Sequence, residues 1–397
     1  MGLSLEWLSA PVLMVFSLPV LVFVTEILVA WVPSGRRRNT PDQAEPLQAY
    51  AVLVPAHNEG SSLSSTLESI LQCPDPLRRV LVVADNCTDD TASLARAMGV
   101  EVVERHDPSL RGKGYALQFG LDHLASSPPS TVLVIDADCI VSGTDLQRLA
   151  LESQHCRGPV QGRYLMHARP GAPVGAKISE FAWLVKTYVR QWGLFKVVGC
   201  CQLLGSGMAF PWEVLASRSL ATGHIVEDLK LTAELAHDGV FVRFLPDVRV
   251  DSDFPTSDSS RAQQSRRWEH GHLFMILHAC PRLLVQALLR LDIRRLGLAL
   301  DMLVPPLSLL VLMVAALGML EFALALFVEH QLWAAEWAMV LAVLMAASVM
   351  LAWAKWGKQV LTGRELWQIP RFVWAKLDIY RRFVGQREKD WKRADRD

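Results

Sequence analysis

The chain has 397 residues, of which 51% are hydrophobic and 20% are charged, and its 40 Lys and Arg residues balance 40 Asp and Glu residues. A formal net charge of zero excludes a protein that binds polyanions by bulk electrostatics, and the high apolar content excludes a disordered chain. The mean hydropathy of +0.23 favours a protein that is partly embedded in a membrane.

Three long apolar segments predict membrane-spanning helices, at residues 8–32, 297–328 and 332–354. Each is long enough to supply the roughly 20 residues that cross a bilayer. The second segment is the least regular, because Asp301, Pro305-Pro306 and Glu321 interrupt it. Acids inside a membrane often line a pathway. The alternative, that these two acids lie at the ends of spans, stays open.

Basic residues set the predicted topology. Arg36, Arg37 and Arg38 follow the first span directly, within a linker predicted at residues 33–48. Clusters of Lys and Arg near a span stay in the cytoplasm, so we expect the N-terminus outside and the middle of the chain in the cytosol. Residues 355–397, rich in Lys and Arg, predict a basic amphipathic tail on the cytosolic face. The expected location is the inner (cytoplasmic) cell membrane, in a multi-pass topology.

The middle of the chain alternates between strand and helix patterns. Short apolar runs predict strands at residues 49–55, 80–84, 101–104 and 131–135, and periodic segments between them predict helices at 61–73, 91–98 and 115–125. This alternation indicates an α/β domain, placed at residues 49–275, with a parallel sheet covered by helices on both faces. Residues 276–296 predict an interfacial helix. Ligands of such sheets bind beyond the carboxyl ends of the strands.

Asp136 and Asp138 follow the fourth predicted strand. Where the chain leaves the sheet, both carboxylates can turn toward one point. Hard oxygen ligands suit Mg²⁺ or Mn²⁺, and such an ion neutralises the diphosphate of a nucleotide. The Asp-x-Asp pattern is common by chance, so a pair of solvated loop acids is the alternative.

Six further motifs surround this pair. They are Val52-Leu-Val-Pro55-Ala56-His57-Asn58-Glu59, Val82-Val-Ala-Asp85-Asn86, Arg111-Gly-Lys113-Gly114, Gly205-Ser206-Gly207, Val226-Glu227-Asp228 and Gln264-Ser-Arg266-Arg267-Trp268. Their order resembles that of the membrane-embedded family 2 inverting glycosyltransferases, which include cellulose, chitin and hyaluronan synthases and ceramide glucosyltransferases. The resemblance implies a cytosolic GT-A domain, which is Rossmann-like and binds a nucleotide sugar, with one transmembrane helix before it and two after it.

The resemblance assigns several residues to the donor. Asp85 would hold the nucleotide base, and Lys113 would place positive charge near the nucleotide. Asp138 would bind the metal, and Asp136 would share that ion or bond the nucleotide sugar. The remaining donor-side residues are Pro55, Ala56, Glu59 and Arg267. A turn or helix-capping acid is the alternative for Asp85, and a solvated surface lysine is the alternative for Lys113.

Asp228 matches the catalytic base of the family. One carboxylate would deprotonate an acceptor hydroxyl while that oxygen attacks the anomeric carbon from the face opposite the leaving UDP. A single displacement of this kind turns an α-linked donor into a β-glycoside. Family members often carry Thr where this chain has Val226, which is a departure from the pattern. The alternative for Asp228 is a capping acid of the helix predicted at residues 229–236.

Gln264, Arg267 and Trp268 share one face at helical spacing. In the family this motif lies beneath the acceptor channel, where Trp stacks on a pyranose, Gln bonds sugar hydroxyls and Arg reaches the diphosphate. Gly205 is also expected at the acceptor. An amphipathic interfacial helix with basic residues is the alternative.

The predicted function is transfer of a sugar from a nucleotide sugar, expected to be a UDP-sugar, to a growing polysaccharide or oligosaccharide. The expected partners are the donor, a glycan or lipid acceptor and the membrane, with a homo-oligomer or an export partner left open and no nucleic acid. One alternative is non-processive transfer of a single sugar to a membrane lipid, as in ceramide glucosyltransferases. The other is a non-catalytic membrane scaffold.

Overall fold

The computed structural model describes residues 6–33, 46–327 and 332–385. The predicted linker, apart from its ends, and its three arginines lie outside these residues, as does the tail from residue 386. The chain forms two compact units. Among the described residues, the helical unit comprises 6–33, 170–198, 272–327 and 332–385, and the sheet unit comprises 46–169 and 199–271.

The sheet unit is built on eight strands in the order β3-β2-β1-β4-β7-β6-β8-β5. The strands are β1 (Tyr50–Ala56), β2 (Arg78–Asp85), β3 (Glu101–Arg105), β4 (Thr131–Val134), β5 (Ile140–Val141), β6 (Val160–His167), β7 (Met208–Pro211) and β8 (Arg243–Asp253). The first four strands pair in parallel, as predicted. Beyond these four strands the sheet is mixed, because β7 runs antiparallel to both β4 and β6. With only four residues, β7 leaves no periodic pattern to recognise.

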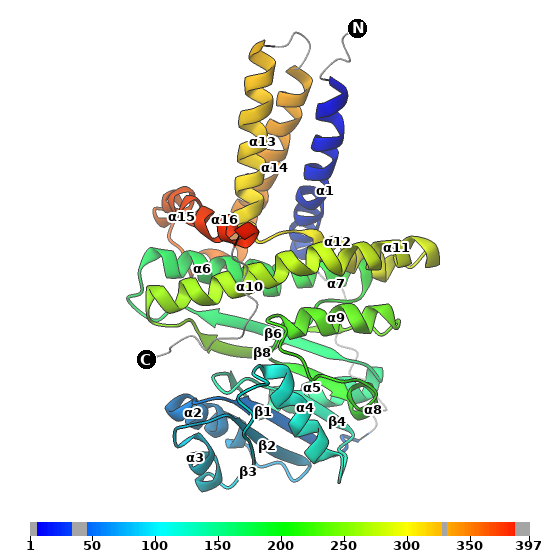
Figure 1. The fold of residues 1–397 in the computed structure, drawn as a ribbon, viewed down its shortest axis with the longest axis vertical. Coiled ribbons are helices and arrows are strands. Elements are labelled where there is room, and N and C mark those ends of the chain that lie inside the picture. The colour runs from blue at the N-terminus through cyan, green and yellow to red at the C-terminus, as the bar shows by residue number, and fades with distance from the viewer. Residues whose placement is uncertain (1–5, 34–45, 328–331, 386–397) are drawn as a thin grey trace. The chain divides into compact units, whose positions relative to one another are not determined.

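Helices flank the parallel half of this sheet (Figure 1). The helices of the sheet unit are α2 (Gly60–Leu71), α3 (Thr91–Ala97), α4 (Lys113–Leu124), α5 (Gly143–Cys156), α8 (Trp212–Ala216) and α9 (Glu227–His237). Strands β1 and β4 are almost wholly buried, which is why they read as continuous apolar runs. Helix α4 lies close to β1, since a Cβ on Gly120 would come within 2.4 Å of Leu53 Cδ1. The carboxyl ends of β1, β2 and β4 meet at one edge.

The helical unit contains the three helices that are long and apolar enough to span a membrane, at Ala10–Trp31, Leu307–Leu326 and Leu332–Gly357. Its elements are α1 (Glu6–Trp31), α6 (Val174–Leu184), the π-helix η1 (Val185–Arg190), α7 (Gln191–Val198), α11 (Cys280–Arg290), α12 (Ile293–Leu303), α13 (Leu307–Phe327), α14 (Leu332–Ala352), the π-helix η2 (Trp353–Gly357), the 3₁₀-helix η3 (Glu365–Gln368), α15 (Ile369–Ala375) and α16 (Leu377–Gly385). Helix α10 (Asp258–His278) crosses from the sheet unit into the helical unit after Gly271. Together with α11 it forms a pair, bent by 41°, that is also apolar enough for a span.

The segment predicted as one span at residues 297–328 consists of two helices. Helix α12 ends at Leu303 and α13 begins at Leu307. The intervening Pro305-Pro306 lacks amide donors and disfavours helix in the residue before it. Asp301 therefore precedes the candidate span, whereas Glu321 lies within it and is buried. The predicted interfacial helix is likewise divided, among the end of α10, α11 and the start of α12.

A buried ion cluster joins three elements of the helical unit. Arg190 Nε lies 2.6 Å from Glu26 Oε2 of α1, and Arg190 Nη2 lies 2.6 Å from Asp301 Oδ1 of α12. The three side chains are 7%, 4% and 0% exposed. We call these residues the Arg190 cluster. Beside it, a Cβ on Gly193 would fall 2.0 Å from Glu26 O, so only glycine allows α7 to lie this close to α1.

Candidate active site

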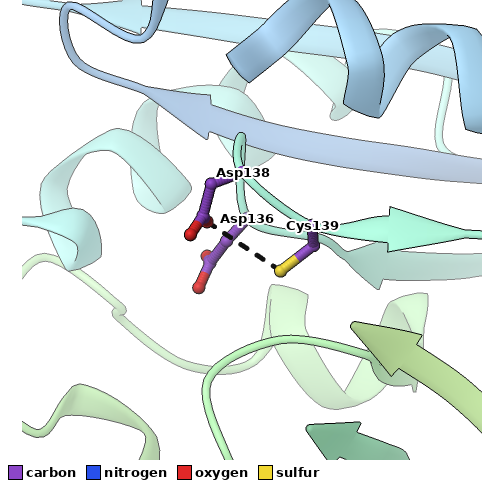
Figure 2. A group of neighbouring side chains, drawn as sticks. All are labelled: Asp136, Asp138 and Cys139. Atoms are coloured by element: carbon purple, nitrogen blue, oxygen red, sulfur yellow. Dashed lines mark hydrogen bonds between the residues drawn. The ribbon is translucent and has the colours of Figure 1, made fainter. Parts of the chain in front are cut away.

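Asp136 and Asp138 lie in the loop between β4 and β5, and their carboxylates point to the same side (Figure 2). Ligand atoms of these two residues and of Cys139 all lie within 4.8 Å of one another. Burial raises the pKa of the Cys139 thiol well above its usual value, and Ser206 Oγ donates to Cys139 Sγ at 3.2 Å. Because the thiolate is the form that binds metals, the two carboxylates are the donors that fit a hard divalent cation here.

Lys113 connects four of the motifs. Its Nζ lies 2.5 Å from Asp136 Oδ1 and 3.6 Å from Glu227 Oε1, and it donates to Gly205 O at 2.7 Å. Burial lowers the pKa of Lys113, but the two carboxylates outweigh this effect and hold the pKa above its usual value. We call Lys113, Asp136 and Glu227 the Lys113 cluster. Lys113 is thus a partly buried, paired cation. The alternative interpretation, in which Lys113 is a solvated surface lysine, is wrong.

Glu227 and Asp228 open helix α9, where the positive end of the helix dipole favours carboxylates. Burial raises the pKa of Glu227 to about 7, against the lowering effect of Lys113. Asp228 Oδ1 accepts the amide of Leu229 at 2.8 Å within the first turn of the helix, whose N-cap is Val226. Its other oxygen faces the loop of Gly205, since a Cβ on that glycine would lie 3.5 Å from Asp228 Oδ2. The structure therefore brings Lys113, Asp136, Gly205 and Asp228 together.

Asp85 ends β2 and is paired with Arg105, the last residue of β3. Arg105 Nη1 donates to Asp85 Oδ1 at 2.6 Å, and both side chains are about nine-tenths buried. Arg105 also donates to Leu110 O at 3.0 Å. Asp85 does not cap the following helix, because the N-cap of α3 is Asp90. Its contact with a nucleotide base stays a prediction.

Pro55 and Ala56 end β1 at the same edge of the sheet. Ala56 O accepts from Cys87 Sγ at 3.6 Å. Glu59 is the N-cap of α2, and its amide donates to Thr91 Oγ1 at 3.0 Å. The roles of these residues at the donor also stay predictions.

The Gln-x-x-Arg-Trp motif lies on helix α10, as its spacing predicts. Gln264 is 3% exposed, and Arg267 and Trp268 are half-buried. Helix α10 approaches the start of α9 closely, since a Cβ on Gly271 would come within 2.6 Å of Val226 Cγ1. Val226, the departure from the family pattern, is thus a packing residue at this contact. The contacts of Gln264, Arg267 and Trp268 with an acceptor stay predictions.

Sequence reasoning missed several residues that the structure places around the site. Glu227 gave a signal, because it is an acid adjacent to the expected base. Arg105 could have been found as the cation that ends the third strand. Gln161 is fully buried, and it gave no signal of its own because its role comes from a loop distant in sequence. Ser206, also fully buried, lay within the Gly205-Ser206-Gly207 motif but had no role assigned to it.

A sheet with a parallel half, two carboxylates after β4 and an acid pair at the start of α9 define the GT-A fold. The match to a family model confirms this class: residues 46–271, more than half of the chain, match the model described as glycosyltransferase like family 2. The chain belongs to that family.

Curated relatives match part of the chain. An uncharacterized glycosyltransferase of Mycobacterium tuberculosis (strain ATCC 25618 / H37Rv) is 35% identical over 148 residues, which are 37% of this chain and 59% of that protein. The 4,4'-diaponeurosporenoate glycosyltransferase of Staphylococcus aureus (strain USA300) is 32% identical over 118 residues, which are 29% of each protein. The matched regions therefore span at most about three fifths of these relatives.

A solved structure matches nearly the whole chain in fold. The mannosyltransferase PcManGT from Pyrobaculum calidifontis, in complex with GDP-Man and Mn²⁺, has a TM-score of 0.56 and 17% sequence identity. The match covers 96% of this chain and 99% of that one. At this level of identity the likeness establishes the fold.

Proposed function

We propose that this protein is an inverting glycosyltransferase that moves a sugar from a nucleotide sugar to an acceptor at the membrane and forms a β-glycosidic bond. The observation that carries the proposal is the convergence at Lys113. This one cation contacts Asp136 after β4, Glu227 beside the proposed base, and the Gly205 carbonyl. Family membership supports the proposal.

The donor site is proposed at the carboxyl edge of β1, β2 and β4. Asp85 would contact the base, Lys113 and Arg267 would face the diphosphate, and Asp136 and Asp138 would hold Mg²⁺ or Mn²⁺. Pro55, Ala56 and Glu59 would line the same side. A bound divalent ion would neutralise the diphosphate leaving group. The solved neighbour named above carries GDP-Man and Mn²⁺, so GDP-sugars and UDP-sugars are both candidate donors.

Asp228 is the proposed general base. It would take the proton of an acceptor hydroxyl as the oxygen of that hydroxyl bonds to the anomeric carbon. The bond from that carbon to the diphosphate would break at the same time, and the nucleotide diphosphate would leave with the electron pair. Lys113, held near Asp228 by the Gly205 carbonyl, would face the negative charge that develops on the leaving group.

The acceptor is proposed to reach Asp228 along helix α10, with Gln264, Trp268 and Gly205 in contact with it. The Gln-x-x-Arg-Trp motif supports a growing polysaccharide or oligosaccharide as acceptor. A membrane lipid that receives a single sugar is the second candidate. A relative named for 4,4'-diaponeurosporenoate rather than for a polysaccharide favours it, as do the three candidate spans among residues 6–33, 46–327 and 332–385.

The protein is proposed to lie in the cytoplasmic membrane with its sheet unit in the cytosol and its N-terminus outside. The three candidate spans support a multi-pass membrane protein. The hairpin of α11 and α12 is proposed to lie in the cytoplasmic interface. Its exposed apolar residues support this placement: Val285, Leu288, Leu289, Leu291 and Ile293 are 56–92% exposed, and arginines 282, 290 and 294 flank them.

The test is release of nucleotide and transfer of sugar by the purified full-length protein in lipid nanodiscs. A panel of UDP- and GDP-sugars would be offered with Mg²⁺ or Mn²⁺, to the wild type, to Asp228→Asn and to the control Glu234→Gln. Glu234 is on the same helix, and its side chain is 45% exposed. We expect one donor to react, with a loss of about 10²–10⁴-fold in Asp228→Asn only.

Product analysis separates the remaining alternatives. Sizing distinguishes a polymer from a single addition, and the anomeric configuration must be β from an α-linked donor. Retention of the donor configuration would contradict the proposed single displacement. Nucleotide binding without release from any donor would favour the non-catalytic scaffold.

A further inference from the structure

The loop at residues 203–207 lies between the donor side and the base side of the proposed site. Two of its residues, Gly205 and Gly207, have φ values of +92° and +71°. L-residues with a side chain rarely adopt such conformations, so a side chain at either position would strain the backbone of this loop. What holds the loop in place therefore decides how its neighbours are arranged.

Gln161, a fully buried residue of β6, binds this loop through both ends of its amide. Its Oε1 accepts from Leu204 N at 2.8 Å. Its Nε2 donates to Ser206 O at 2.8 Å and lies 3.3 Å from Gly207 O. These partners are backbone amides and carbonyls, so they fix which end of the side-chain amide is oxygen and which is nitrogen. One side chain thus makes three hydrogen-bond contacts with the loop, beside the backbone bonds from Gly162 N to Gly207 O and from Gly207 N to Val134 O.

The loop in turn contacts the groups of the proposed reaction. Gly205 O accepts from Lys113 Nζ at 2.7 Å, and Ser206 Oγ accepts from Asp136 N at 3.0 Å. On the base side, Leu203 N donates to Thr232 Oγ1 at 2.9 Å, and that hydroxyl donates to Asp228 O at 2.8 Å. A displacement of the loop would change the distance between the donor side and the base.

We propose that Gln161 is a positioning residue. It acts through the 203–207 loop and fixes the positions of Lys113 and Asp136 relative to Asp228. The inference rests on the proposed function for its catalytic consequence. Its structural consequence, a loop that loses order when the buried amide of Gln161 is removed, stands without it. Since Gln161 acts between the two sides rather than on the nucleotide alone, its loss should lower kcat more than it weakens nucleotide binding.

The first test uses Gln161→Met, which keeps the size of the side chain and removes its hydrogen bonds. The control is Gln147→Met in the same unit, where the half-buried glutamine donates to Asp75. We expect kcat to fall at least tenfold in Gln161→Met and the dissociation constant for the nucleotide diphosphate to change less than threefold. Backbone hydrogen exchange at residues 203–207 should rise in Gln161→Met only.

The second test uses Gln161→Glu, which keeps the shape of the side chain. A buried carboxyl is favoured in its neutral form, and in that form it can donate to Ser206 O as the amide does. Once ionised, it would repel the two carbonyls. Relative to the wild type, Gln161→Glu should therefore keep its activity at low pH and lose it as pH rises, whereas Gln161→Met should show no such relative change.

The outcomes separate the two proposals. If the wild type transfers sugar and Gln161→Met matches it in kcat and in loop exchange, the positioning role is wrong. Equal losses in kcat and nucleotide affinity, together with a Gln161→Glu profile parallel to that of Gln161→Met, would indicate a merely structural residue and also overturn it. An inactive wild type would count against the proposed function, and loop exchange would still decide whether Gln161 fixes the loop.

Discussion

The two units of the molecule each contain a cation between two carboxylates, and the two clusters differ in kind. In the sheet unit, Lys113 contacts Asp136 and Glu227, and the three side chains keep 17–26% of their surface exposed. In the helical unit, Arg190 contacts Glu26 and Asp301, and no side chain is more than 7% exposed. The arrangement of charge is the same, but access to solvent and the chemistry of the cation are not.

This difference matches what each cluster has to do. Arg presents a planar fork that fixes two partners in direction, and Lys is a compact charge on a flexible stem. Arg190 holds α1, the π-helix and α12 together through separate nitrogens, which suits a permanent contact. Lys113 has three partners within 3.6 Å on a flexible stem, which would suit a site where a charged ligand enters and leaves. The comparison predicts that Arg190 affects stability and Lys113 affects activity.

The largest expected effect is on the Arg190 cluster. Arg190→Met would leave Glu26 and Asp301 buried without their cation, and breaking a buried pair in this way costs about 3–5 kcal/mol of folding free energy. Thermal unfolding of the detergent-solubilised protein would measure the loss. The triple variant Glu26→Gln, Arg190→Met, Asp301→Asn is the control and should recover much of it. Unchanged stability in the single variant would show that the Arg190 cluster does not stabilise the fold.

Lys113→Met should act on the reaction. Removing one preorganised electrostatic donor costs about 10²–10³-fold in kcat, and we expect a loss of this size in nucleotide release from the preferred donor. Lys230→Met is the matched control in the same unit, because its i,i+4 pair with Glu234 lies on the surface of α9. If both lysine variants were equally active, Lys113 would have no part in the reaction.

Arg190→Lys tests whether the fork itself matters. A lysine keeps the charge but cannot reproduce both directed contacts of Arg190, so at least one charged hydrogen bond is lost. Such a bond contributes about 1.5–3 kcal/mol, and the midpoint of thermal unfolding should fall by less than in Arg190→Met. A variant as stable as the wild type would mean that charge alone is sufficient at this position.

The last prediction concerns the pH dependence of stability. The pKa of Glu227 is raised by burial to about 7, above its ordinary value near 4.5, so the unfolded chain releases this proton at lower pH than the folded one. The contribution of Glu227 to stability is therefore largest below pH 4.5 and falls as pH rises to about 7. Thermal unfolding of Glu227→Gln across this range should show a shallower decline than the wild type. An identical decline in both proteins would show that another group, not Glu227, releases the proton responsible for it.

Much of the sheet unit could be predicted from sequence because its parallel half is buried on both faces. Strands β1, β2 and β4 each contain a continuous apolar run, and polar residues follow each run, so the fold class and the edge of the candidate site could be predicted. Strand β7 was not predicted, since its four residues Met208–Pro211 include a proline and do not form the run of β-branched residues that marks β4. Its antiparallel direction follows from pairing with strands that lie elsewhere in the chain.

The site could be predicted only where a motif carries its own chemistry. Asp136 and Asp138 stand out as a pair of acids after a strand, and Asp228 as part of an acid pair. Gln161 does not stand out, because a glutamine in a strand becomes a loop support only when residues 204–207 fold against it. The boundary of the second span was missed for a local reason, since Pro305-Pro306 ends a helix inside a segment that is apolar throughout.

The Arg190 cluster also has a consequence for the order in which the chain is assembled during synthesis. Glu26 precedes Arg190 by 164 residues, and Arg190 precedes Asp301 by a further 111. At roughly 5–20 residues per second, Arg190 follows Glu26 by about 8–33 s, and Asp301 follows after about 6–22 s more. The first helix is therefore made before the whole sheet, whose strand β8 ends at Asp253, and Asp301 follows after both. The last contacts of α1 form only when α14 has left the ribosome, because Trp337 Nε1 of that helix donates to Ser17 Oγ, so packing of α1 is a late step in the biogenesis of this protein.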